Sequence, residues 1–179
     1  MIVSGTKELA ATRDVVWSVI NEPSEMAKLM PGVESFEIHD EKHWAAKVKV
    51  PLGLGGLKMT MNFEKLEERE PEFASMRAKG QGVGALMDMK TSFTLSENDG
   101  GTSMAWEADV KIAGPVGAMG QRVLQPIVNQ QVSQVLTALE TRVAEVAGST
   151  GGAAQGIHPA SPEAYEAAPE GPTHSTQDS

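Results

Sequence analysis

The chain contains no cysteine among its 179 residues. It can therefore form no disulfide, no thiolate metal site and no cysteine nucleophile. Long apolar runs are also missing, since no stretch approaches the roughly 18 consecutive apolar residues that a membrane-spanning helix needs. Residues 1–7 lack the basic and then apolar profile of a secretion signal. These absences predict a cytoplasmic protein that no helix of its own anchors in a membrane.

Positive charge is scarce as well. Lysine and arginine number 15 against 24 aspartates and glutamates, a formal net charge of −9. Such a balance repels polyanions, so we expect no nucleic-acid partner. Residues 148–179 hold four of the acidic residues and no basic ones, so residues 1–147 carry a net charge of only −5. That part is long enough to bury one hydrophobic core.

The composition changes sharply after Ala147. Residues 148–179 are rich in Gly, Ala, Pro, Ser and Thr, and Tyr165 is their only aromatic residue. Such a segment cannot bury enough apolar surface to offset the entropy lost on ordering. The sequence therefore predicts one domain at residues 1–147 and a disordered acidic tail at residues 148–179. A docking peptide at residues 162–169 is the alternative for part of that tail.

Within residues 1–147, apolar periodicity and turn residues define the elements. The pattern predicts a first strand, two short helices, six further strands and one long helix that Pro126 kinks. The predicted strands are 2–10, 33–39, 43–50, 57–64, 73–79, 85–95 and 104–112, and the predicted helices are 13–20, 23–30 and 116–146.

This order predicts an α+β fold. A meander of antiparallel strands leaves one face uncovered, and the long C-terminal helix is the element able to close it. We therefore expect a helix-grip architecture, in which a curved antiparallel sheet of about seven strands wraps around the C-terminal helix. Space that side chains do not fill can remain between the two.

The inward-facing residues offer little chemistry. The inward phase of the central strands offers no carboxylate, lysine or histidine, so no catalytic residue is predicted. An enzyme would require Asn62, Arg77 or Asp88 to point inside. His39 and His43 flank a polar turn without a third ligand, so we expect no metal site.

Several local motifs resemble the G-subunit family of carbon monoxide dehydrogenase, which belongs to the START-like superfamily together with pollen allergens and polyketide cyclases. Two departures from the family pattern are Thr12 in place of proline and Val33 in place of cysteine. The motifs are Val16-Trp17, residues 22–34, Gly80-x-Gly82-x-Gly84, Gly101-Thr102 and residues 114–122, and the resemblance covers about residues 1–147.

The resemblance implies a Bet v 1-like fold with an open cavity, in an accessory protein that recruits a molybdenum-containing carbon monoxide dehydrogenase to the inner face of the cytoplasmic membrane. We expect no covalently bound cofactor and an isoprenoid quinone or lipid as a non-covalent ligand. A plain membrane anchor with a filled core and a cyclase- or aromatase-type enzyme are the alternatives.

Methionine is abundant on the predicted inner face. Flexible, polarizable thioethers adapt to ligands of imprecise shape, although a packed core that uses methionine as a gap filler fits equally well. The residues expected to line the cavity are Met59, Met61, Phe63, Met87, Met89, Phe93, Met104, Trp106, Met119, Val123 and Ile127.

A glycine-rich hairpin tip at residues 51–57 carries three leucines, Leu52, Leu54 and Leu57. Each leucine that is fully removed from water contributes about 1.5–3 kcal/mol, so two or three would give weak, reversible membrane attachment. A hairpin that packs on a neighbouring part of the protein is the alternative. We expect these leucines to touch the membrane.

Overall fold

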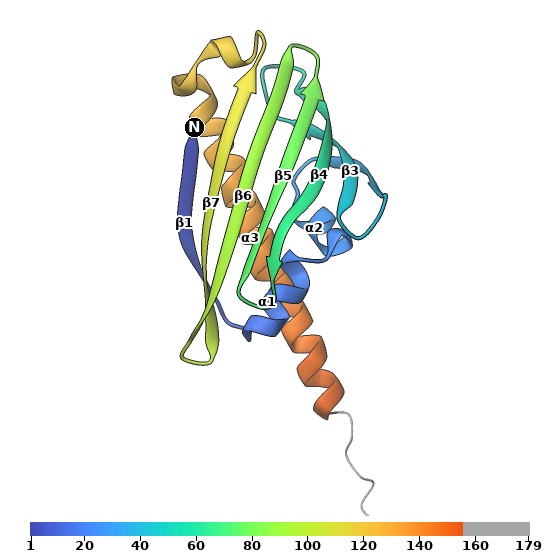
Figure 1. Cartoon of the computed structure of the whole chain (residues 1–179), viewed down its shortest axis with the longest axis vertical. Coiled ribbons are helices and arrows are strands. Elements are labelled where there is room, and N and C mark those ends of the chain that lie inside the picture. The colour runs from blue at the N-terminus through green and yellow to red at the C-terminus, as the bar shows by residue number, and fades with distance from the viewer. Residues whose placement is uncertain (156–179) are drawn as a thin grey trace, which may run out of the picture.

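Seven antiparallel strands form one sheet in the computed structural model, which describes residues 1–155 (Figure 1). The strand order is β1-β7-β6-β5-β4-β3-β2. The elements are β1 (Ile2–Leu9), α1 (Arg13–Ile20), α2 (Pro23–Leu29), β2 (Val33–Ile38), β3 (His43–Val50), β4 (Leu57–Arg69), β5 (Phe73–Gly82), β6 (Ala85–Asn98), β7 (Gly101–Ala113), the short 3-10 helix η1 (Gly117–Met119) and α3 (Gln121–Gln155). The predicted α+β helix-grip fold is confirmed.

Alternation along the strands sets the two faces of the sheet. On β4, Met59, Met61 and Phe63 are buried, while Thr60 and Asn62 between them are exposed. Successive side chains of a strand point to opposite faces, so the apolar set faces α3 and the polar set faces water. The periodicity predicted these inner and outer faces correctly.

The C-terminal helix begins later than its periodicity predicts. Gly120 has a φ of 83° and separates η1 from α3. Glycine adopts this left-handed backbone conformation without steric cost, and a residue in that conformation ends a right-handed helix. The single helix predicted from Val116 is therefore divided into η1 and α3. Met119 and Val123 therefore lie at an exposed corner, with 48% and 44% of their surface accessible. Their predicted place over the sheet interior is wrong for this conformation.

At its other end α3 reaches Gln155, past the domain boundary at Ala147 that composition predicts. The rest of the predicted tail, residues 156–179, lies outside the described residues. None of the described helices combines the length and the apolar composition required to span a bilayer.

The core consists of three clusters on the inner face. One joins α1 to α3 and includes Val16 and Leu139, and a second joins β3, β4 and β5 around Trp44. The third is smaller and centres on Val3 and Val110. The backbone of α3 lies close to α1, α2, η1 and the edge strand β1. Side chains of α3 also pack on the sheet itself, since Val128 and Val132 join the third cluster.

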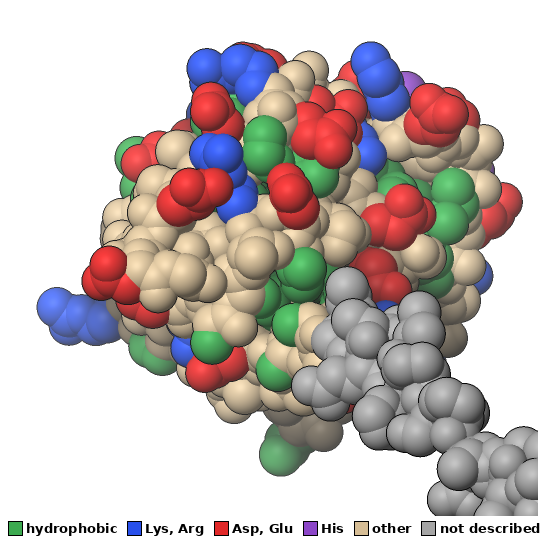
Figure 2. All heavy atoms as spheres, turned by 90° about the horizontal axis from the view of Figure 1, so that it is seen from below, with side chains coloured by type: hydrophobic (Ala, Val, Ile, Leu, Met, Phe, Trp, Pro, Cys, Tyr) green, Lys and Arg blue, Asp and Glu red, His purple; other side chains and the backbone are tan. Residues whose placement is uncertain are grey.

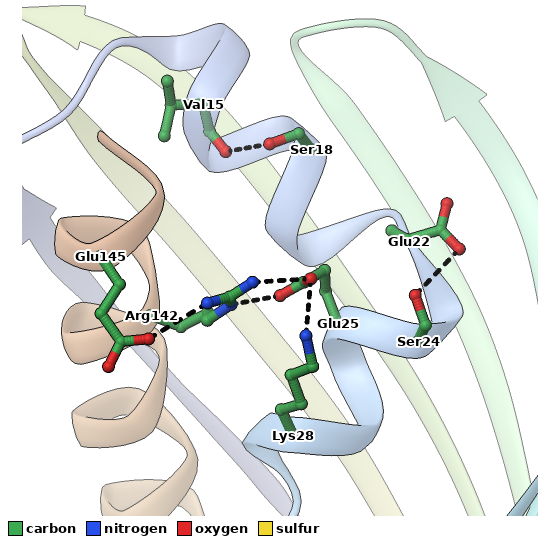
Figure 3. Close-up of polar contacts among 8 residues, drawn as sticks. All are labelled: Val15, Ser18, Glu22, Ser24, Glu25, Lys28, Arg142 and Glu145. Atoms are coloured by element: carbon green, nitrogen blue, oxygen red, sulfur yellow. Dashed lines mark hydrogen bonds and ion pairs between the residues drawn. The ribbon is translucent and has the colours of Figure 1, made fainter. Parts of the chain in front are cut away.

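An ion pair links α2 to α3 (Figure 3). Arg142 donates hydrogen bonds from Nε and Nη2 to the carboxylate of Glu25, the latter over 2.9 Å. Lys28 donates to the same carboxylate over 2.9 Å, and Arg142 also pairs with Glu145. The hydrogen bonds from Arg142, and less strongly those from Lys28, lower the pKa of Glu25 from 4.5 to about 2. The pair fixes α2 against the long helix.

This ion pair predicts a pH-dependent contribution to stability. A carboxyl group with a lowered pKa stabilises the folded state above its unfolded pKa, and the contribution is lost as the pH falls through the folded pKa. We expect Glu25→Gln to lower the free energy of unfolding by about 1–2 kcal/mol at neutral pH, allowing for the partial exposure of the pair. The difference should shrink as the pH falls from 4.5 toward about 2.

Urea unfolding of both proteins, followed by circular dichroism at several pH values, measures this difference. Glu41→Gln, on the exposed turn between β2 and β3, is the control and should change nothing. A difference between Glu25→Gln and the native chain that stays constant down to pH 2 would contradict the assignment.

Candidate functional site

The inner face of β6 is less completely covered than that of β4. Met87, Met89 and Phe93 on β6 are only partly buried, although β6 has a strand on each side. Protein interiors are normally close-packed, and a strand in the middle of a sheet that is covered by a helix should be well shielded. The partial exposure of these side chains shows that α3 does not seal the inner face along β6.

The helix contributes apolar side chains to the same region. Val128 and Val132 of α3 pack against the third cluster together with Met87 and Met89, and all four side chains are partly exposed. Ile127 is partly exposed as well. This is an apolar region between α3, β6 and β7 that borders the second cluster, against which Met87 and Met89 also pack.

The eleven residues predicted to line a cavity divide into three groups. Met59, Met61 and Phe63 are buried in the cluster around Trp44, and Met104 is fully buried under α1. Met119 and Val123 lie at the exposed corner described above. The partly exposed residues on the inner side, and so the remaining lining candidates, are Met87, Met89, Phe93, Trp106 and Ile127.

Gly80 explains why the β4 methionines are packed. A Cβ atom at Gly80 would lie 2.6 Å from Met61 Sδ and 2.9 Å from Met59 Cε. The two thioethers therefore occupy the space that a side chain on β5 would take. On this side of the sheet methionine acts as a gap filler, as one of the two interpretations of the sequence holds.

The polar residues whose orientation decides the enzyme alternative lie on the outer face. Asn62 is exposed, and Arg77 donates to Asp88 from Nε over 2.8 Å and also from Nη2. The Arg77 hydrogen bond holds the pKa of Asp88 below its usual value of 3.8. These three residues therefore supply no acid-base pair to the inner face.

The two domain histidines lie on the exposed β2–β3 turn, as the sequence predicts. His43 Nδ1 is 2.9 Å from Asp40 Oδ1. Within residues 1–155 no three His, Asp or Glu side chains gather closely enough to hold a metal ion. The turn is closed by this local hydrogen bond.

Three loops meet at one end of the sheet, which we call the tip end: residues 51–56, 83–84 and 114–120 (Figure 1). Leu54 is fully exposed there, whereas Leu52 is half-buried and Leu57 packs against the second cluster. Sequence reasoning missed two further exposed apolar residues at this end, Val83 and Leu86, and placed Met119 and Val123, which are also exposed here, in the cavity. The predicted strand order contained the signal for this. Alternate turns of a meander lie at the same end of the sheet, so the turn at residues 83–84 and the segment after β7 could have been placed beside the hairpin at residues 51–56.

The two ends of the molecule differ in charge. Basic residues near the tip end are Lys47, Lys49, Lys58, Lys79, Lys111 and Arg122. The opposite end holds α1 and the turns at residues 70–72 and 99–100, and Figure 2 shows many acidic side chains spread over it, with fewer basic ones among them. They include Glu70, Glu72, Glu97 and Asp99. Glu34 and Asp88 lie among these lysines, so the tip end of the mildly acidic domain is apolar and only on balance basic.

Two shallow hollows lie on the outer face close to the tip end. The larger has a volume of about 490 Å³ and the smaller about 280 Å³, and they share Asp88 and Lys111. Charged side chains dominate the smaller hollow, whereas Leu86, Met87 and Ile112 line the larger one together with polar residues of the outer face. We assign no ligand to these hollows.

Comparison with known proteins agrees with the architecture. The family model for the G subunit of carbon monoxide dehydrogenase (CoxG) matches residues 5–144. No curated protein sequence matches the chain. A conserved protein from Geobacillus kaustophilus is similar in structure, with a TM-score of 0.75, 23% identity, and coverage of 81% of this chain and 96% of that one.

A START superfamily protein from Mycobacterium smegmatis has a TM-score of 0.62 and 16% identity, and covers 81% of this chain and 98% of its own. A protein from Thermus thermophilus has a TM-score of 0.60 and 14% identity, with 81% and 98% covered. At these identities the likenesses establish the fold, which is START-like.

Proposed function

Since the chain belongs to the CoxG family, the G-subunit family of carbon monoxide dehydrogenase, we propose that it is an accessory protein that carries an apolar molecule to and from that enzyme. The ligand we propose is an isoprenoid quinone, and the enzyme a molybdenum-containing carbon monoxide dehydrogenase. The protein would recruit this enzyme to the inner face of the cytoplasmic membrane and link it to the quinone pool.

The observation that carries the ligand proposal is the partial exposure of the inner face of β6. Met87, Met89 and Phe93 retain accessible surface although Val128 and Val132 of α3 pack in the same region. Concave, mostly apolar sites with few polar groups are typical of binding sites for small apolar molecules. Carbon monoxide oxidation releases electrons that must reach the membrane, where quinones are the apolar acceptors.

Analysis of the bound lipids tests this proposal. Protein purified from its native host should release an isoprenoid quinone on solvent extraction, in an amount approaching one per chain, as measured by mass spectrometry. The absence of quinone from several independent preparations would contradict the proposal and favour a plain anchor.

We further propose that the tip end contacts the membrane. Leu54 and Val83 are the most exposed apolar side chains there, and each would contribute up to about 1.5–3 kcal/mol if fully removed from water. The flanking lysines would add electrostatic attraction to anionic headgroups, about 1 kcal/mol for each basic residue near the surface. Together these terms give reversible binding, which a carrier needs.

Replacing both tip residues with charged ones should remove this attachment. We expect the double variant Leu54→Glu, Val83→Glu to bind phosphatidylcholine–phosphatidylglycerol vesicles at least about ten-fold more weakly than the native chain, because it loses apolar burial and gains repulsion. Co-sedimentation with the vesicles measures the change.

Ile38→Glu is a matched control, because Ile38 is an exposed apolar residue on β2 next to the turn at the opposite end of that strand. It should bind vesicles like the native chain. Equal losses in the control and the double variant, or no loss in either, would show that the tip end is not the contact.

A further inference from the structure

Two buried polar atoms on neighbouring strands of the inner face, β6 and β7, have no hydrogen-bond partner among residues 1–155. They are the hydroxyl oxygen of Thr91 on β6 and the indole Nε1 of Trp106 on β7. Thr91 retains only 8% of its surface. Buried polar groups in proteins are nearly always paired, so two unpaired groups on one surface call for an explanation.

The two residues are neighbours on the same face. Thr91 lies opposite Ala108 in the β6–β7 ladder, and Phe93 lies opposite Trp106. Thr91 and Trp106 are therefore diagonal partners, whose separation in such ladders is about 7–8 Å. A single small molecule held over β6 and β7 can reach both side chains.

Gly5 on β1 holds the indole in place. Gly5 lies opposite Trp106 in the β1–β7 ladder, and a Cβ atom there would lie 3.0 Å from Trp106 Cζ2 and 3.3 Å from Nε1. The indole thus rests across a position without a side chain, at the edge of the sheet that α3 contacts. Its N–H group is positioned by this packing and not by a polar partner.

The surroundings of the pair are apolar and partly open. The inner-face neighbours of Thr91 along β6 are Met89 and Phe93, both partly exposed. Across the ladders Thr91 faces Met76 and Ala108. The nearest charged residue on this face is Lys7, two positions along β1 from Gly5, and it is already paired with Glu140 of α3. A buried carboxylate would therefore find no free counter-charge, whereas a neutral oxygen would need none. Trp44 Nε1 is also unpaired, but it lies in the closed second cluster.

We propose that Thr91 and Trp106 bind a neutral carbonyl oxygen of an otherwise apolar ligand, with the indole N–H and the threonine hydroxyl as donors. This inference rests on the proposed ligand-binding function and names its polar contact. Neither atom is open to solvent in the ligand-free protein, so Met89 or Phe93 turns aside as the ligand enters. Methionine, with three rotatable bonds, is suited to that movement.

The pairing makes the site selective for oxygen-bearing ligands. A site with donors that only the correct ligand can pair discriminates against an analogue that lacks the acceptor, because the donors then stay unpaired. A quinone ring presents carbonyl oxygens on an apolar skeleton, whereas a hydrocarbon of the same shape presents none. Discrimination between two such molecules is therefore the property to measure.

Calorimetric titration of the full chain with menadione and with 2-methylnaphthalene measures this discrimination. The two probes share a carbon skeleton, and only menadione carries carbonyl groups. The chain has no cysteine, so menadione forms no thiol adduct. For Thr91→Val we expect the menadione Kd to rise about five-fold, the equivalent of one neutral hydrogen bond, with little change for 2-methylnaphthalene. Trp106→Phe should act similarly, and the double variant should lose about 25-fold if the two effects add.

Thr102→Val is the matched control. Thr102 is a fully buried threonine whose hydroxyl donates to the Ala11 carbonyl over 2.7 Å. The Thr102→Val variant should lose thermal stability and still prefer menadione over 2-methylnaphthalene. Thr91→Val should keep its stability, because the Thr91 hydroxyl makes no hydrogen bond in the ligand-free protein.

The possible outcomes are distinct. Equal weakening toward both probes, or a loss of stability in Thr91→Val like that in Thr102→Val, would overturn the polar contact and leave the carrier proposal intact. If the native chain binds neither probe, both proposals fail together.

Discussion

Met89→Trp is expected to reduce menadione binding at least about 30-fold and to change the free energy of unfolding by less than about 1 kcal/mol. Met89 points to the inner side of β6 and keeps accessible surface there. A tryptophan would extend into that space and occupy the place of a ligand. Inserting bulk into a filled core usually costs about 1–3 kcal/mol, so a small cost here would mean that the space was open.

Calorimetric titration gives the affinity and urea unfolding gives the stability in this experiment. Met104→Trp is the matched control: Met104 is fully buried in the α1 cluster, so the same change should be strongly destabilising. If Met89→Trp destabilises the protein as much as Met104→Trp does, the inner side is filled, and the membrane-anchor alternative is preferred.

Trp44→Ala is expected to lower the free energy of unfolding by about 3–5 kcal/mol, the usual loss when a large buried aromatic side chain is truncated. Trp44 is 1% exposed and stacks on Phe63, with ring centroids 5.4 Å apart and planes at 5°. It holds β3 to β4 at the centre of the second cluster. Removing it leaves a cavity that the neighbouring strands cannot close without shifting.

Urea unfolding monitored by circular dichroism measures this loss. Trp44→Phe keeps an aromatic ring for the stack and should lose clearly less than the alanine variant. A loss below about 1 kcal/mol for Trp44→Ala would mean that β3 contributes little to the cooperative core.

Much of the fold could be predicted because it depends on local patterns. Alternation places Met59, Met61 and Met89 on the inner side, and the pair Asp99-Gly100 marks the β6–β7 turn, where Asp99 has a φ of 44° and Gly100 of 83°. The boundaries of β3 and α1 also follow from the sequence alone. These features are set by the backbone of each segment and its nearest neighbours.

The candidate site could be predicted only in part, because the period of a strand does not say how far the covering helix lies from it. Met61 and Met89 have the same inward phase, yet Met61 fills the space over Gly80, whereas Met89 remains partly exposed. The break at Gly120 likewise depends on the approach of η1 to the end of β7, where Ala118 donates to the Gly114 carbonyl. Neither distance is contained in a pattern of apolar residues.

The separation of lysines at the tip end from acidic side chains at the α1 end gives the molecule an electric dipole. Near a negatively charged surface a dipole experiences a torque, which turns the positive end inward before any atom makes contact. The field acts over about 8 Å at physiological ionic strength, so the alignment occurs in the last steps of approach. For the membrane contact proposed above, encounters would begin in the binding orientation, and the rate of association with anionic vesicles should fall as salt is added.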